Sequence, residues 1–172
     1  PEKKHEARYL VRNALRSLNF YGAERMVRIN QGQRGLDDLD FVVPHHVNLI
    51  LVPKVESAEE LVAVQNKIDQ IKKAHHINHP IWLMPILESA KGVMNAYAIA
   101  QATDTVSPMA IGLEDYTADM GVRRTQEATE SFFARNMVVT ASIAAGIQPI
   151  DSVYSDISDM EGLAKNVQAS KA

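Results

Sequence analysis

The sequence predicts an α/β fold with a parallel sheet, of the (β/α)8 TIM-barrel type. Short, almost continuously apolar segments recur along the chain, as expected for parallel strands buried on both faces. They occupy residues 25–30, 49–55, 81–87, 106–113 and, more weakly, 148–153. Longer segments with helical spacing separate them, which favours βα units. The chain also opens and ends in a helical segment, whereas an open five-stranded domain usually opens with a strand.

The predicted helices are indicated by apolar spacing and by end signals. Residues 3–18 carry apolar side chains three and four positions apart. Residues 57–60 (SAEE) form a capping box that opens the second helix, and residues 158–161 (SDME) form another near the chain end. Residues 125–145 are expected to form one long helix that ends at Gly146.

Length and composition limit the domain organisation and the class of partner. A chain of 172 residues with 46% hydrophobic residues is one domain by length, but an eight-unit barrel typically needs about 250 residues. We therefore expect residues 1–172 to form a single barrel domain, incomplete at both ends, that covers about five βα units. The net charge of -3 gives no reason to bind nucleic acid or an anionic membrane. The absence of cysteine, of a signal peptide and of a membrane-spanning apolar run fits the cytoplasm.

Two acidic residues follow consecutive predicted strands. Glu88 comes directly after the third strand, and Asp115 comes just after the fourth. Neighbouring parallel strands lie about 4.8 Å apart, so two carboxylates at the same end of the sheet can share a hard cation. Mg²⁺ prefers one or two carboxylates and leaves its other positions to water and substrate oxygens. The alternative is that both acids only cap the helices that follow them.

Two further residues near the same strand ends suggest substrate contacts. Arg28 lies inside an otherwise apolar strand, and a buried arginine needs a partner. That partner is either a substrate carboxylate or a structural acid such as Glu88. Gly112 precedes the acidic pair Glu114 and Asp115, so exposed backbone amides there would suit a substrate carboxylate. The alternative is an ordinary loop glycine.

Other kinds of site receive little support. The histidines of residues 75–79, together with His45 and His46, precede strands and should lie at the opposite end of the sheet from the acids. Without a cysteine, a solvated loop is a better interpretation there than a zinc site. The sequence has no GxSxG motif, no P-loop and no GxGxxG motif between a strand and a helix, so it does not support a serine hydrolase or a nucleotide-binding fold.

Several motifs in order make the sequence resemble a known family. They are VRIN (27–30), VPKVESAE (52–59), PILESAKGV (85–93), IGLED (111–115), AAGI (144–147), ID (150–151), VYSD (153–156) and EG (161–162). Together they resemble the citrate lyase β-subunit family within the HpcH/HpaI-type aldolases, and the tail from residue 135 to 162 looks especially like that subunit.

The resemblance implies a function and a set of site residues. It implies a TIM barrel, often trimeric or hexameric, that binds Mg²⁺ through Glu88 and Asp115. It implies substrate contacts from Arg28 and Glu88, and we assign Gly112 and Glu114 to the same substrate site. The implied reaction cleaves a citryl-type 3-hydroxyacyl thioester, carried by CoA or an acyl-carrier subunit, to the 2-oxo acid oxaloacetate and an acetyl thioester. Other citrate lyase subunits are implied as partners.

Several alternatives stay open. Relatives in the same group cleave malyl-, methylmalyl- or citramalyl-CoA. A non-catalytic barrel subunit of a lyase complex is a second class, although the joint presence of Arg28, Glu88 and Asp115 argues against it. An open flavodoxin-like regulatory domain is a third, and it predicts that the 172-residue chain folds alone. The residues identify no general base, because the family's first strand, last two strands and C-terminal lid have no counterpart in this sequence.

Overall fold

The computed structural model describes residues 3–125 and 127–171, in which strands and helices alternate. The strands are β1 (Met26–Arg28), β2 (Leu49–Val52), β3 (Trp82–Leu87), β4 (Pro108–Ile111) and β5 (Gln148–Ile150). The α-helices are α1 (Lys4–Ser17), α2 (Gly32–Val42), α3 (Ala58–Ala74), α4 (Ala90–Met94), α5 (Ala96–Ala100), α6 (Leu113–Asp119), α7 (Phe132–Ala145) and α8 (Met160–Lys171). Two 3₁₀ turns, η1 (Val43–His45) and η2 (Thr129–Ser131), complete the elements.

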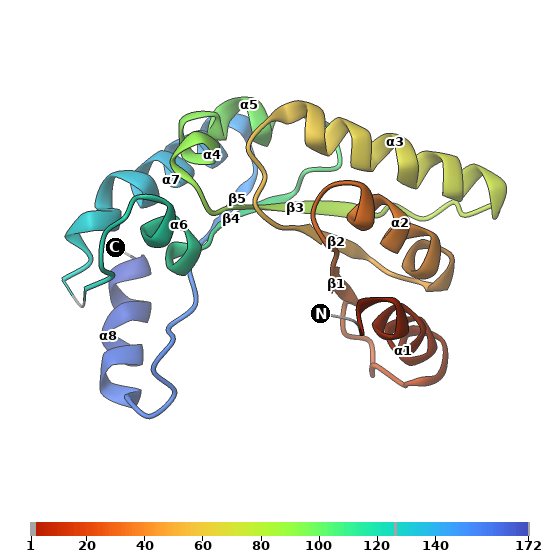
Figure 1. Ribbon diagram of the computed structural model, residues 1–172, viewed down its shortest axis with the longest axis horizontal. Coiled ribbons are helices and arrows are strands. Elements are labelled where there is room, and N and C mark those ends of the chain that lie inside the picture. Colours follow the sequence, from red (N-terminus) through yellow and green to blue (C-terminus); the bar gives the residue numbers. More distant parts are fainter. Residues whose placement is uncertain (1–2, 126, 172) are drawn as a thin grey trace.

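The strand order separates a barrel from an open doubly wound sheet. All four strand pairs are parallel, and the order in the sheet is β1-β2-β3-β4-β5. A doubly wound sheet reverses its order and carries helices on both faces. Here each crossover advances in one direction, so the right-handed connections leave their helices on one side. Figure 1 shows the result, a curved sheet with α3, α5 and α7 along its convex side. The barrel-type fold is therefore confirmed and the flavodoxin-like alternative is wrong.

The core lies between the sheet and this layer of helices. Successive helices contact one another around the arch, α1 with α2, α2 with α3, α3 with α5 and α5 with α7. Fully buried side chains from strands and helices interlock between the layers, among them Ile50, Leu61, Ile68, Leu83 and Met109. The apolar strand runs and the apolar helix faces thus form one continuous core.

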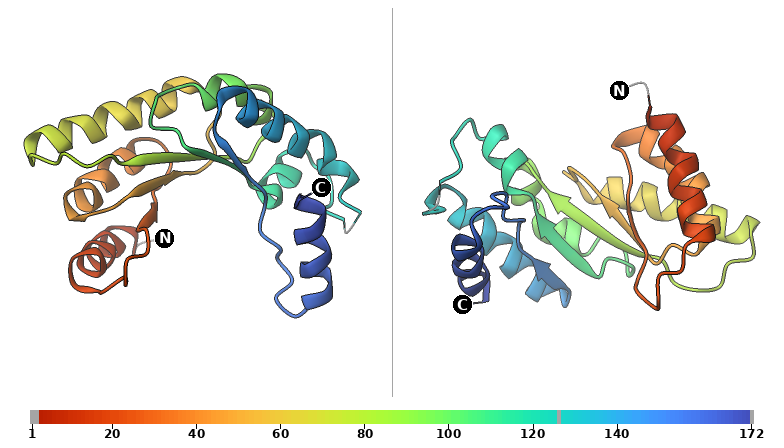
Figure 2. Two further views of the ribbon diagram at one scale, coloured as in Figure 1. Left: turned by 180° about the vertical axis from the view of Figure 1, so that it is seen from behind. Right: turned by 90° about the horizontal axis from the view of Figure 1, so that it is seen from below.

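The concave face of the sheet carries the alternate side chains of each strand. Ile29 is buried in the helix-facing core, whereas Met26, Arg28 and Trp82 are exposed. The strand period of two residues explains this division. Figure 2 shows α1 and α8 at opposite ends of the arch. No helix within residues 3–125 and 127–171 is long and apolar enough to cross a membrane.

Three local predictions were wrong. The long helix expected over residues 125–145 begins only at Phe132, because the left-handed φ of 54° at Ala128 interrupts a continuous helix. Glu130 accepts hydrogen bonds from the backbone and hydroxyl of Thr125 in the turn before it; residue 126 lies outside the described residues. Ser57 occupies the N-cap of α3 without a side-chain capping bond. Asp159, rather than Ser158, accepts the backbone N–H of Gly162 at the start of α8. The helix end at Gly146 is confirmed, with a left-handed φ of 75°.

Candidate functional site at the carboxyl ends of the strands

Polar side chains from the loops after β1, β2, β3 and β4 gather at one edge of the sheet. They line an open cleft of about 440 Å³. Its lining residues are Gln31, Lys54, Glu56, Glu60, Glu88, Ser89, Asp115, Ala118 and Asp119. In a barrel this end of the sheet is the one that carries active sites. Glu88 and Asp115, which the sequence predicted to meet, therefore share one cleft.

Glu88 is the most deeply buried acid of the cleft. It follows β3 directly, and only 6% of its side chain is exposed. The backbone N–H of Lys54 donates to its Oε2 at 2.9 Å. Burial raises the pKa of Glu88, although the Lys54 amide and the Arg28 guanidinium oppose that shift. The carboxylate is thus held by a fixed backbone donor while its charge remains only partly compensated.

Asp115 lies in the first turn of α6 and faces the same space. Its Oδ1 accepts a hydrogen bond from Lys54 Nζ at 3.0 Å. This bond lowers the pKa of Asp115, and the neighbouring charges of Lys54 and Arg28 act in the same direction. Glu88 and Asp115 are close enough for each to influence the pKa of the other. The two environments therefore push their pKa values in opposite directions.

Lys54 connects the two acids, and sequence reasoning gave it no role. It contacts Glu88 through its backbone and Asp115 through its side chain. Its φ of 51° lies in the left-handed region, which costs free energy for any residue with a Cβ. The signal in the sequence was a charged residue inside VPKVESAE, directly after an apolar strand. That pattern gives no indication of a partner 61 positions away.

Arg28 reaches the edge of this site from the end of β1. Its Nη2 lies 3.9 Å from Glu88 Oε2, but 53% of its side chain is exposed. The prediction of a buried arginine was wrong, because the alternate face of β1 looks toward the concave side of the sheet. The alternative that Glu88 is the partner of Arg28 holds only in part, since a separation of 3.9 Å is too long for a hydrogen bond. The guanidinium remains accessible to a ligand.

Gly112 has a different role from the one expected. Its backbone N–H donates to the carbonyl of Leu87 at 2.9 Å, so this amide is part of the sheet and is not free to bind a carboxylate. A Cβ built on Gly112 would lie 2.8 Å from Glu88 Oε1. Real Cβ atoms essentially never approach so closely, so the absence of a side chain creates the space that the Glu88 carboxylate occupies.

Glu114 is directed away from the cleft. Its carboxylate pairs with the Arg124 guanidinium and accepts a hydrogen bond from the Ser155 hydroxyl. The hydrogen bond from Ser155, and after it the one from Arg124, lower the pKa of Glu114. Glu114 therefore ties α6 to the segment after β5, and its predicted contact with substrate has no support in this arrangement.

The helix after β3 closes one wall of the cleft. Ser89 caps α4 by accepting the N–H of Gly92 at 3.1 Å, and its hydroxyl donates to Glu56 at 2.8 Å. Asp119 accepts the N–H of Ala90 at 2.9 Å. A Cβ on Gly92 would lie 2.6 Å from the carbonyl oxygen of Val55, so Gly92 allows α4 to sit against the loop after β2.

The donor chemistry fits a hard divalent cation with few protein ligands. Within the described residues there is no cluster of three or more histidine, cysteine, aspartate or glutamate side chains with metal-binding geometry. Two carboxylates at one edge, one of them in a cradle that a Cβ at Gly112 would fill, match the preference of Mg²⁺ for one or two carboxylates and several waters. A structural zinc site needs four ligands and does not fit.

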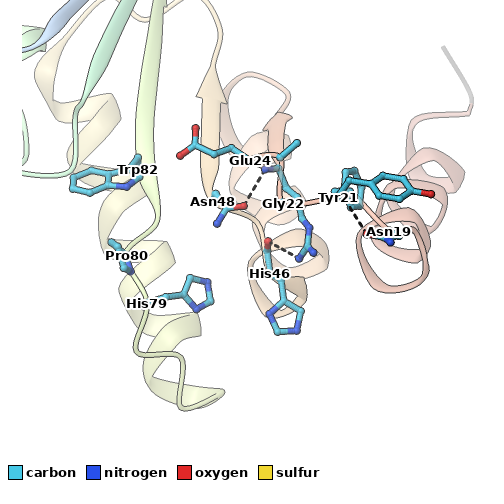
Figure 3. Close-up of a pocket in the computed structure, with 12 residues that line it drawn as sticks. Asn19, Tyr21, Gly22, Glu24, His46, Asn48, His79, Pro80 and Trp82 are labelled. Atoms are coloured by element: carbon cyan, nitrogen blue, oxygen red, sulfur yellow. Dashed lines mark hydrogen bonds between the residues drawn. The ribbon is translucent and has the colours of Figure 1, made fainter.

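A second cavity lies at the opposite end of the strands (Figure 3). The rings of His46 and His79 stack there with centroids 6.4 Å apart. Arg25 donates from its backbone to Asn48 and from its guanidinium to the carbonyl of His46. The predicted location of these histidines, away from the acids, is confirmed.

An acidic cleft at the carboxyl ends of sequential parallel strands defines a βα-barrel type of site. The family model for HpcH/HpaI aldolase/citrate lyase matches residues 1–172, and the chain belongs to this family. A citrate lyase subunit beta from Leuconostoc mesenteroides subsp. cremoris is 35% identical over 175 residues, which cover 96% of this chain and 56% of that protein. The human mitochondrial citramalyl-CoA lyase is 31% identical over 175 residues, which cover 95% of this chain and 52% of that protein.

Solved structures agree on the fold. A citrate lyase beta subunit from Mycobacterium tuberculosis, complexed with oxaloacetate and magnesium, superposes with a TM-score of 0.76 at 23% identity. The match covers 98% of this chain and 70% of that one. The chain spans about half the length of the curated relatives named above.

Proposed function

We propose that this chain forms the metal- and oxo-acid-binding part of a Mg²⁺-dependent carbon–carbon lyase. The reaction is cleavage of a citryl-type 3-hydroxyacyl thioester to oxaloacetate and an acetyl thioester. The observation that carries the proposal is that Glu88 and Asp115 line one cleft, with the Arg28 guanidinium 3.9 Å from Glu88, in a chain of the HpcH/HpaI aldolase/citrate lyase family. The oxaloacetate and magnesium named for the M. tuberculosis relative support the choice of ligands.

The chemistry of this cleavage matches the groups present. Mg²⁺ bound by Glu88 and Asp115 would act as a Lewis acid on the oxygen that becomes the ketone. The exposed Arg28 guanidinium can clamp a substrate carboxylate or stabilise the negative charge of a thioester enolate. Lys54 fixes the orientation of the Glu88 carboxylate through its backbone N–H. A general base for the substrate hydroxyl is not among these assignments.

Cleavage of citramalyl-CoA is a second candidate, supported by the human enzyme of that name at 31% identity. Both reactions break a carbon–carbon bond beta to a thioester carbonyl and release a 2-oxo acid, so the same residues would serve. The released acid distinguishes them: oxaloacetate carries a second carboxylate and pyruvate does not. A non-catalytic barrel subunit is a third candidate, and it predicts no turnover of either thioester by the complete protein.

Several features of the whole protein belong to the same proposal. We infer an acyl thioester of CoA or of an acyl-carrier subunit as substrate, and a homo-oligomer, trimer or hexamer, as the assembly. Other citrate lyase subunits are expected partners if the carrier is a protein. Further βα units, beyond these 172 residues, would complete the barrel. The chain's lack of cysteine supports the cytoplasm as its location.

Calorimetric titration of the complete protein with oxaloacetate, with and without Mg²⁺, tests the proposal. We expect binding only when the metal is present, and no Mg²⁺ binding after Asp115→Ala or Glu88→Ala. Lys67→Ala is the control, because Lys67 pairs with Asp40 between α3 and α2, away from the cleft. If Asp115→Ala binds Mg²⁺ as tightly as the wild type, the metal site is wrong. If oxaloacetate binds under neither condition, the non-catalytic subunit is favoured.

A further inference from the structure

Lys54 occupies an unusual position among the charges of the cleft. Its ammonium group makes its one hydrogen bond in the described residues to Asp115 Oδ1, at 3.0 Å. Its backbone N–H is committed to Glu88 Oε2. The residue therefore touches both acids that we assign to the metal, and its own positive charge lies where a cation would approach Asp115.

The backbone geometry argues that this arrangement is specific. A lysine in the left-handed region, at φ 51°, is kept there only if surrounding contacts compensate for the strain. The bond to Glu88 is such a contact, and it fixes the point from which the side chain leaves the loop. With 42% of the side chain exposed, the ammonium has room to move away from Asp115, while the backbone bond to Glu88 keeps the residue at the cleft.

We propose that Lys54 is a built-in cation that holds the Asp115 carboxylate until Mg²⁺ takes its place, and that its released ammonium then contacts the bound 2-oxo acid. This inference rests on the proposed metal site. Two cations cannot occupy the same face of Asp115, because their charges repel at short range. The backbone bond to Glu88 need not break in the exchange, so the ammonium stays beside the anion that binds the metal.

The exchange predicts two effects of opposite sign from one substitution. Lys54→Met removes the competing charge, so Mg²⁺ alone should bind about fivefold more tightly. The same change removes a cation from the anion site, so oxaloacetate at saturating Mg²⁺ should bind about tenfold more weakly. If Lys54 only supported the loop, its replacement would weaken the binding of both Mg²⁺ and oxaloacetate. Lys54→Arg, which keeps the charge, should restore oxaloacetate binding to within about threefold of the wild type.

Titration calorimetry on the complete, chelator-treated protein measures both affinities, first with Mg²⁺ and then with oxaloacetate. Lys91→Met is the matched control, because Lys91 pairs with Glu56 at 3.2 Å on the rim of the same cleft and should leave both affinities unchanged. Lys54→Asn is a second test in case Lys54→Met does not fold, because asparagine tolerates the left-handed region and carries no charge. It should behave as Lys54→Met does.

The outcomes separate this inference from the proposed function. If the wild-type protein does not bind Mg²⁺, the proposed function fails and this inference fails with it. If the wild type binds Mg²⁺ but Lys54→Met and Lys54→Asn bind it equally or more weakly, only the exchange is wrong. If the two Lys54 variants bind Mg²⁺ more tightly than the wild type but bind oxaloacetate equally well, Lys54 does not contact the oxo acid, and the proposal is also overturned.

Discussion

The Glu88 carboxylate occupies the space that a side chain at Gly112 would fill. A Cβ at Gly112 would lie 2.6 Å from Glu88 Cγ and 2.8 Å from Oε1. The two residues follow neighbouring strands. The N–H of Gly112 donates a hydrogen bond to the carbonyl of Leu87, so the backbone at Gly112 is held in place. The position of the buried acid therefore depends on the absence of a side chain on the next strand.

Gly112→Ala should accordingly impair the metal site more than the fold. The added methyl group pushes the Glu88 carboxylate from its place, and we expect Mg²⁺ affinity to fall at least about tenfold. The free energy of unfolding should fall by about 1–3 kcal/mol, as for other overpacked positions. Calorimetry with Mg²⁺ and urea denaturation measure the two effects.

Gly121→Ala is the control for that change. Gly121 has a φ of 68° and no atom near the position of a Cβ, so alanine there costs about 1 kcal/mol through backbone strain. It should leave Mg²⁺ affinity unchanged. Equal Mg²⁺ affinities in Gly112→Ala and the wild type would show that Glu88 does not hold the metal from this position.

Arg28 should affect turnover more than metal binding. Its guanidinium lies 3.9 Å from Glu88 and is largely exposed, so it is free for substrate. We expect Arg28→Ala to lower kcat/KM for the thioester at least about a hundredfold, as for loss of a charged stabilising group. Mg²⁺ affinity should stay within about threefold. Steady-state kinetics and calorimetry test this, and a loss confined to Mg²⁺ binding would contradict it.

The sequence allowed the strands and the acidic pair to be predicted because both depend on local pattern. A strand buried by helices is an apolar run, and the residues after parallel strands meet at one edge. Glu88 and Asp115 could be found in this way. Arg28 was expected to be buried, since the apolar run of β1 implies burial on both faces, but 53% of its side chain is exposed.

Other features depend on contacts that no local pattern records. The role of Lys54 requires a left-handed backbone conformation and a partner 61 residues away. Helices α4 and α5 contain only five residues each, too few to give a helical period. Gly112 was expected to expose backbone amides to a substrate carboxylate, because neither the hydrogen bond of its N–H to the Leu87 carbonyl nor its close approach to the Glu88 side chain shows in the local sequence.

Asp38 should be a major determinant of the stability of the β1 end. This buried acid of α2 accepts hydrogen bonds from Arg8 at 2.6 Å and from both the backbone and the side chain of Asn30. Asp38→Ala leaves these donors without their acceptor, and we expect the free energy of unfolding to fall by about 3 kcal/mol. Urea denaturation of the complete protein measures it.

The neighbouring acid provides the control for that measurement. Asp37 is half exposed and lies 3.9 Å from Arg8, so Asp37→Ala should change the free energy of unfolding by no more than about 0.5 kcal/mol. If Asp37→Ala and Asp38→Ala were equally stable, the network around Asn30 would contribute little to the fold.

The pair of Arg135 and Asp151 should make stability depend on acid pH. Burial alone would raise the pKa of Asp151, but hydrogen bonds from Arg135 and Ser170 more than offset it, so the pKa lies below the usual 3.8. A carboxylate with a depressed folded pKa stabilises the fold above its unfolded pKa and loses that contribution as the pH falls through the folded value. The pair joins α7 to the segment after β5, so its loss should weaken that connection.

We therefore expect Arg135→Met to lower the free energy of unfolding by about 2 kcal/mol at neutral pH, for a half-buried ion pair. This difference from the wild type should stay constant down to about pH 4 and shrink below it, because protonated Asp151 no longer needs its partner. Urea denaturation of both proteins at a series of pH values gives the curve. Lys165→Met, which removes an exposed pair with Glu161, should show a difference of no more than about 0.5 kcal/mol throughout. A constant difference for Arg135→Met through the acid range would mean that Asp151 stays ionised there or contributes through packing alone.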